Sequence, residues 1–167
     1  SVNIPGSVKE IGKAAFAICE SLEKVVIEDG VKAIGEHAFQ GCKSLKKITF
    51  PKSVTTLKSY ALSKTGFTSF ELPETITALG DYVFWQCENL KTISISNSIK
   101  TAGECIFDEC KALESVDIAE GVSELWDYMF LKCTGLKSIK IPQSVTTIKE
   151  YALSKTGFDS FEIPETI

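Results

Sequence analysis

The sequence repeats itself with a period of 23 residues. Rows that begin at Val8, Val31, Val54, Ile76, Ile99, Val122 and Val145 bring one pattern into register, with steps of 23, 23, 22, 23, 23 and 23 residues. A fixed period of this length is typical of solenoids, in which each repeat forms one coil. Eight apolar positions per row are too few to make a core alone. Each coil must therefore bury its apolar side against its neighbours.

The pattern within a row predicts the secondary structure of a coil. The first row reads V-x-x-I-x-x-x-A-F-x-x-C-x-x-L-x-x-V-x-I. Stretches that follow the Leu position, such as "LKTISIS", "LESVDIA" and "LKSIKIP", alternate apolar and polar residues and are rich in β-branched residues, which predicts one strand per coil. Such strands should stack into a parallel sheet with a spacing of about 4.8 Å. The A-F-x-x-C segment is too short for an α-helix, so we expect a helical or 3₁₀ turn there.

These features predict a single α/β-type repeat solenoid over residues 1–167, made mainly of strand and loop, with seven coils. The first residues, "SVNIP", resemble the end of an earlier row, and Ile167 falls where an eighth row would begin. We therefore expect the chain to be a segment of a longer array.

Two rows depart from the pattern in the same way. The octapeptide "YALSKTGF" occurs at residues 60–67 and again at residues 151–158, in rows that are one residue short. In these rows Thr65 and Thr156 stand where the other rows have Cys. We expect Gly66 and Gly157 to adopt a positive φ that permits the tighter turn. The recurrence after four rows indicates that a block of four rows was duplicated as a unit.

The repeat resembles a known family. The A-F-x-x-C-x-x-L-x-x-I-x-I-P-x-x-V signature, over seven consecutive rows, is similar to the BspA-type subclass of leucine-rich repeats. It departs from the standard leucine-rich repeat in placing its Cys three residues before the Leu. The resemblance implies a non-enzymatic adhesion module of a secreted or cell-surface protein, which binds a host protein or glycan through a repeat face. The alternative is a structural spacer or stalk that presents another domain.

Composition excludes several other classes of function. The chain has 18 Lys and no Arg, against 22 acidic residues. It therefore lacks the guanidinium groups that bind phosphates and base edges in many nucleic-acid-binding proteins, and we expect no nucleic acid partner. No apolar run approaches the roughly 20 residues that a membrane span needs, so we expect no membrane insertion within this segment. The first ten residues also lack the pattern of a secretion signal.

The residue types that carry chemistry are few and scattered. Five of the six Cys, at positions 19, 42, 87, 110 and 133, share one column of the repeat and are expected to point inward as free structural thiols, with disulfides between stacked coils as the alternative. Cys105 lies in another column and is expected to be the exposed thiol. Because the Cys spacings are whole rows, we expect no metal site and no cofactor. His37 is the only histidine and no catalytic arrangement surrounds it, which argues against an enzyme.

Two columns of the repeat are candidate ligand-binding surfaces. Tyr and Trp are favoured at interfaces because they combine area with a polar group. The first candidate is therefore the aromatic set Tyr60, Tyr82, Trp85, Trp126, Tyr128 and Tyr151. The second is the outward face of the strands, which comprises Lys47, Thr49, Ser69, Glu71, Thr92, Ser94, Ser115, Asp117, Ser138 and Lys140. The alternatives are that the rings merely cover the turn and that the strand face is the solvated side that any such sheet has.

Overall fold

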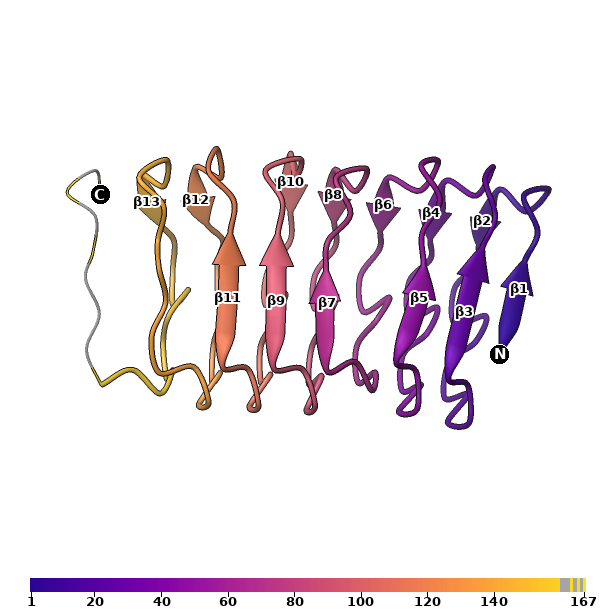
Figure 1. The fold of residues 1–167 in the computed structure, drawn as a ribbon, viewed down its shortest axis with the longest axis horizontal. Helices are drawn as coiled ribbons and strands as arrows, with labels where there is room; N and C mark the ends of the chain where they lie inside the picture. Colours follow the sequence, from indigo (N-terminus) through magenta and orange to yellow (C-terminus); the bar gives the residue numbers. More distant parts are fainter. Residues whose placement is uncertain (160–162, 164, 166) are drawn as a thin grey trace.

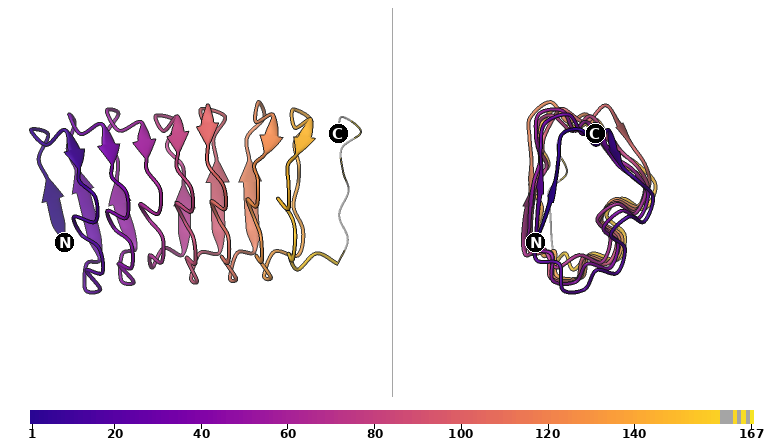
Figure 2. Two further views of the ribbon diagram at one scale, coloured as in Figure 1. Left: turned by 180° about the vertical axis from the view of Figure 1, so that it is seen from behind. Right: turned by 90° about the vertical axis from the view of Figure 1, so that its right-hand side faces the viewer.

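The computed structural model describes residues 1–159, 163, 165 and 167 of the chain. The chain winds into a row of stacked coils, with its two termini at opposite ends (Figure 1). Seen end-on, successive coils lie over one another (Figure 2). The predicted repeat solenoid is therefore confirmed.

Except at the β13 end, each coil carries a longer and a shorter strand on different walls of the solenoid. The longer strands are β1 (Val2–Ile4), β3 (Lys24–Ile27), β5 (Lys47–Thr49), β7 (Ser69–Glu71), β9 (Thr92–Ile95) and β11 (Ser115–Ile118). The shorter strands are β2 (Glu10–Ile11), β4 (Ala33–Ile34), β6 (Thr56–Leu57), β8 (Ala78–Leu79), β10 (Thr101–Ala102), β12 (Glu124–Leu125) and β13 (Thr147–Ile148). All strand pairs are parallel. The prediction of one strand per coil is therefore wrong. The sequence did not reveal the shorter strands because two residues are too few to show an alternating pattern.

About six turns of the solenoid are described. The shorter strands occupy successive coils, so six turns separate β2 from β13. The seventh expected coil, which begins at Val145, runs partly outside the described residues. The expected strand at residues 136–142 does not form, since this stretch makes no paired ladder with β11.

The A-F-x-x-C segments form turns and no helix within the described residues, so the expected helical or 3₁₀ turn is not confirmed. In the third row Ala61 N–H donates to the Lys58 carbonyl within the turn, whereas Tyr60 N–H donates to Asp81 of the next coil. The two kinds of hydrogen bond alternate along the segment in this way. A helix needs every N–H for bonds within its own segment, and here half of them are used to join coils.

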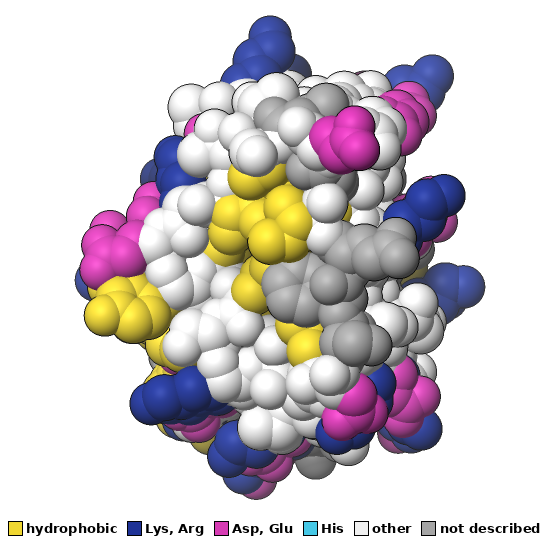
Figure 3. Space-filling model, turned by 90° about the vertical axis from the view of Figure 1, so that its left-hand side faces the viewer, with side chains coloured by type: hydrophobic (Ala, Val, Ile, Leu, Met, Phe, Trp, Pro, Cys, Tyr) yellow, Lys and Arg dark blue, Asp and Glu magenta, His cyan; other side chains and the backbone are white. Residues whose placement is uncertain are grey.

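Apolar side chains fill the interior as columns of like residues. Seen from the end of the solenoid near β13, they gather at the centre and charged side chains surround them (Figure 3). The Phe84 and Phe107 rings stack with centroids 5.3 Å apart, and Phe107 and Phe130 stack at 5.5 Å. Such columns bury each coil against the next, as the repeat requires.

Four cysteines of the predicted column line this core as free thiols. The Cys110 thiol donates to the Phe84 carbonyl of the preceding coil at 3.1 Å, and the Cys133 thiol donates to Phe107 at 3.2 Å. Burial raises the pKa of Cys133 to about 12. In the short third row the Thr65 hydroxyl donates to the Leu62 carbonyl at 2.8 Å. These thiol and hydroxyl groups thus donate hydrogen bonds to backbone carbonyls inside the core.

Two cysteine predictions are wrong. Cys19 is exposed, because the structure contains no turn segment stacked on the outer side of the first coil. Cys105 is only 5% exposed, and its thiol forms a hydrogen bond with the Tyr82 side chain.

The role expected of Gly66 and Gly157 is also wrong. Neither glycine adopts a positive φ; among the described residues of the short rows, this conformation is found at Tyr60, Lys64, Tyr151 and Lys155. Glycine is required instead for close packing. A Cβ on Gly66 would lie 2.0 Å from the Lys43 carbonyl oxygen of the preceding coil, and one on Gly157 would lie 2.1 Å from the Thr134 oxygen.

Both walls of the solenoid are interrupted once. The longer strands form two separate sheets, with the break between β5 and β7, and the shorter strands break between β10 and β12. These breaks divide the predicted continuous parallel sheet, and Figure 1 shows the arrows of β5 and β7 standing apart.

Candidate functional site

Four of the predicted aromatic residues form a column on the turn segments, together with His37. The Tyr60 ring stacks on Tyr82 with centroids 4.8 Å apart, and on His37 at the same distance. Farther along, Tyr128 stacks on Tyr151 with centroids 5.2 Å apart. We call this set, with Trp85, the aromatic ridge: His37, Tyr60, Tyr82, Trp85, Tyr128 and Tyr151.

The backbone holds these rings in register. Every Tyr in the ridge has a left-handed backbone, with φ between 51° for Tyr151 and 59° for Tyr60. This region is uncommon for residues other than Gly and costs on the order of 1–3 kcal/mol. It persists here because the Tyr60 and Tyr82 amides donate to carbonyls of the next coil at 2.9 Å. The hydrogen bonds between coils therefore set the direction in which these side chains leave the backbone.

Trp85 closes one side of the ridge. Its ring meets Tyr60 edge-on at 6.1 Å and Tyr82 edge-on at 6.2 Å. The Lys64 ammonium lies 4.5 Å from the centre of the Trp85 ring, within the range of a cation–π contact. All three aromatic side chains remain partly exposed. A ligand at this point would meet aromatic area beside a positive charge.

Cys105 divides the ridge into two parts. It occupies the position of a ridge tyrosine between Tyr82 and Tyr128, and its own backbone is also left-handed. A hydrogen bond with Cys105, together with burial, raises the pKa of Tyr82 well above its usual value. Tyr151 beyond this point is 56% exposed and is the most accessible ring of the ridge.

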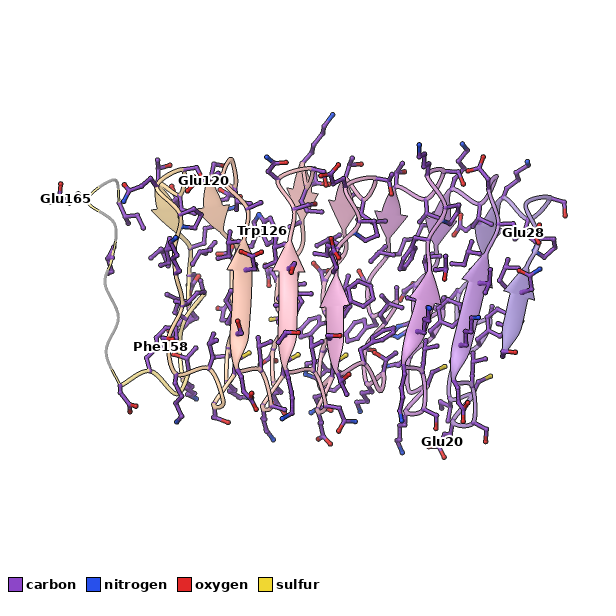
Figure 4. The ribbon with its side chains drawn as sticks, viewed as in Figure 1. Glu20, Glu28, Glu120, Trp126, Phe158 and Glu165 are labelled. Atoms are coloured by element: carbon purple, nitrogen blue, oxygen red, sulfur yellow. The ribbon has the colours of Figure 1, made fainter. Side chains whose placement is uncertain are left out.

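Trp126 lies apart from the ridge. It directly follows β12 and is 7% exposed (Figure 4). Its position in the repeat is occupied by Gly35, Gly80 and Gly103 in other rows. The Gly103 amide donates to the Leu79 carbonyl of the preceding coil, and among the described residues the Trp126 amide makes no such bond. The large indole thus coincides with the break between β10 and β12.

A polar cluster beside Trp85 was not predicted. Asp108 is buried, its Oδ1 has no hydrogen-bond partner among the described residues, and burial raises the pKa of its carboxyl group. The neighbouring Glu109 accepts hydrogen bonds from Lys132 at 2.7 Å and from Gln86 at 2.8 Å, which lower its pKa. The signal in the sequence was an acidic residue, Asp108, in a column that is otherwise uncharged.

The second candidate surface is present as a flat polar face. All of its ten predicted residues are exposed except Ser94, which is half-buried. The break between β5 and β7 separates Lys47 and Thr49 from Ser69 and Glu71.

The described residues offer little for catalysis. His37 is held between Gln40, at 2.9 Å from Nδ1, and Glu36, at 3.1 Å from Nε2. Within the described residues no group of three or more His, Cys, Asp or Glu side chains is arranged to hold a metal ion. That part of the chain also contains no helix able to cross a membrane.

Comparison with known proteins identifies relatives of this repeat. Residues 1–65 and 55–167 match the family model of the BspA type leucine rich repeat region (6 copies). The fold is similar to that of a leucine-rich repeat protein from Bacteroides ovatus, with a TM-score of 0.77 and 27% identity over 99% of this chain and 55% of that chain. It is also similar to the T. pallidum leucine rich repeat protein TpLRR, with a TM-score of 0.78 and 30% identity over 88% of this chain and 72% of that chain. No curated protein sequence matches the chain.

Proposed function

Because the chain belongs to the BspA-type leucine-rich repeat family, we propose that it is a non-enzymatic binding module that holds a protein or glycan ligand on its aromatic ridge. Leucine-rich repeats commonly serve as protein-interaction modules, and solenoids bind through extended faces. The observation that carries the proposal is the stacking of partly exposed rings, with Tyr60 and Tyr82 4.8 Å apart, on a fixed backbone.

Rigid aromatic side chains suit binding for two reasons. Truncation of an interface Tyr or Trp typically costs about 2 kcal/mol or more, whereas exposed Ser and Thr contribute little. Rings that are already stacked before binding also lose little conformational freedom when the ligand arrives. Both arguments favour the ridge over the polar strand face as the source of affinity.

The family resemblance supports a setting for this activity. We place the module on a secreted or cell-surface protein, where it adheres to a host extracellular protein or glycan. The rival function, a spacer or stalk, needs no ligand and gives no role to exposed rings. Binding that depends on the ridge would therefore favour the binding module over the spacer.

The test is a binding survey of the 167-residue protein against soluble extracellular-matrix proteins and a glycan array. We expect at least one saturable interaction, which is weakened in the Tyr151→Ser/Trp85→Ala variant. The matched control is Ser115→Ala/Ser138→Ala, which changes the strand face and should bind as the wild type does. The absence of any saturable interaction would favour the spacer function.

A further inference from the structure

The break between β5 and β7 opens the longer-strand wall of the solenoid. β5 pairs with β3 on one side and β7 pairs with β9 on the other, but within the described residues no backbone hydrogen bond joins β5 to β7. Two parallel strand edges therefore face each other with free N–H and C=O groups. Such edges are templates for pairing with another strand.

The break also uncovers part of the core. Ile48 and Phe70 occupy the same inward column as Val25, which is 0% exposed, and Ile93, which is 1% exposed. Ile48 and Phe70 are nevertheless only half-buried, and so is Phe50 at the next inward position. A contiguous exposed apolar patch surrounded by polar residues is a feature of binding sites.

Bulky aromatic residues explain why the wall stays open at this point. The Phe50 and Phe70 rings meet edge-on with centroids 6.2 Å apart, and Phe70 also packs edge-on against Phe67 at 4.9 Å. The first, fourth, fifth and sixth rows have the smaller Val or Ile at both inward strand positions. Close-packed interiors do not absorb the extra volume, so the two coils stand apart.

The space left between the coils is large enough for a ligand. A cavity of about 370 Å³ lies between the two strands, with phenylalanine rings along its apolar side. Ligand pockets in proteins usually measure about 300–1,000 Å³. An extended peptide is the occupant that uses every feature of this groove, because its backbone can pair with a strand edge while alternate side chains enter the cavity.

The charges at the rim define the chemistry of that peptide. Lys46 and Lys47 on the β5 side and Glu71 on the β7 side are exposed. Within the described part of the chain none of the three takes part in an ion pair. The lysine pair is therefore available to a carboxylate of the ligand.

We propose that the groove between β5 and β7 binds an extended peptide segment of a partner protein, with large aliphatic or aromatic residues directed at the phenylalanine side chains and acidic residues directed at Lys46 and Lys47. The peptide adds a strand to the interrupted wall. This site is separate from the aromatic ridge, so variants at one leave the other unchanged.

The probe is a synthetic fluorescent nonapeptide, ALESVDIAE, which alternates apolar and acidic residues. This is the sequence of residues 112–120, whose strand β11 pairs in parallel in the protein itself. In fluorescence anisotropy at 0.15 M salt we expect saturable binding to the 167-residue protein. A control peptide, ALESSDSAE, keeps the charges but has Ser in place of Val and Ile, and should not bind.

Two protein variants locate the site. Lys46→Glu/Lys47→Glu should weaken binding of the nonapeptide at least tenfold. The matched control, Lys9→Glu/Lys32→Glu, changes two exposed lysines on the shorter-strand side by the same charge and should bind within twofold of the wild type. Hydrogen exchange provides the independent measurement. Without the peptide, the amides of β5 and β7 at the open edges should exchange faster than those of β9. Addition of the peptide should slow the exchange of these β5 and β7 amides.

Several results would overturn the proposal. One is no binding of the nonapeptide at millimolar concentration, and another is equal binding by the Lys46→Glu/Lys47→Glu variant. A third is peptide protection that maps to other strands. Loss of ridge-dependent ligand binding in the survey above would leave this proposal standing, because the nonapeptide assay does not involve the ridge.

Discussion

The side chains of Tyr60 and Tyr82 stack with ring planes 5° apart, and both residues have a left-handed backbone in adjacent coils. The Tyr60 ring also contacts His37 and Trp85, whereas the only ring that Tyr128 contacts among the described residues is Tyr151. Aromatic pairs contribute about 0.5–1.5 kcal/mol each beyond the area that they bury. The two tyrosines should therefore differ in their contribution to stability.

We predict that Tyr60→Ala lowers the free energy of unfolding by at least about 1 kcal/mol more than Tyr128→Ala, because Tyr60 loses more ring contacts. Urea denaturation of the two variants, monitored by circular dichroism, makes the comparison. Equal losses would show that the rings do not stabilise one another.

Gly66 should be intolerant of a side chain. Gly66→Ala places a Cβ 2.0 Å from a backbone oxygen of the preceding coil, so the coils must shift, at a cost of about 1–3 kcal/mol in the free energy of unfolding. Gly12→Ala is the matched control, since no atom lies within 4 Å of the added Cβ, and should change stability by less than about 0.5 kcal/mol. Thermal or urea unfolding that gave the two variants the same stability would contradict the packing found at Gly66.

Asp108 should destabilise the protein near neutral pH. Burial raises the pKa of this carboxyl group in the folded state, so the folded protein binds the proton more tightly than the unfolded chain does. By linkage, its contribution is favourable at low pH and is lost as the pH rises through the folded-state pKa. Asp108→Asn should therefore raise the free energy of unfolding at pH 7, and the gain should shrink towards pH 4. Urea titrations at both values test this, and a gain that grows on acidification would contradict it.

The cysteines should differ sharply in reactivity. In the folded 167-residue protein only Cys19 is exposed, whereas Cys42, Cys87, Cys105, Cys110 and Cys133 are buried. Mass spectrometry after brief alkylation should therefore show one modified thiol in native buffer and six in denaturant. Rapid modification of Cys105 would contradict its burial.

The overall fold could be predicted from the sequence because it repeats with a fixed period. The longer strands were predictable since the alternation recurs at every Leu position, and the inward cysteines since they share one column. Features that depart from the repeat in a single coil were harder to predict. Cys105 was expected to be exposed because it lies outside the inward Cys column, and only the structure shows that it is buried and forms a hydrogen bond with Tyr82.

The breaks in the walls could not be read from the pattern either. Phe50 and Phe70 conform to it as apolar residues, and the gap arises from the volume of two rings that meet across adjacent coils. Trp126 was grouped with Trp85 because both lie near a ridge tyrosine in the sequence. A difference of a few positions in the repeat places one on the ridge and buries the other.

The most direct test of the ridge as the binding surface compares two double variants against a ligand found in the survey. Tyr82→Ser/Tyr128→Ser should lower the affinity about thirtyfold or more, given about 2 kcal/mol for an interface tyrosine and a factor of ten for each 1.4 kcal/mol. Ser94→Ala/Lys140→Ala should change it by less than about threefold, since the polar contacts of Ser and Lys usually contribute little to an interface. Circular dichroism and the melting temperature serve as the folding control. We expect a folded tyrosine variant with weakened binding; a variant that unfolds, or a loss of affinity confined to Ser94→Ala/Lys140→Ala, would contradict the ridge as the binding surface.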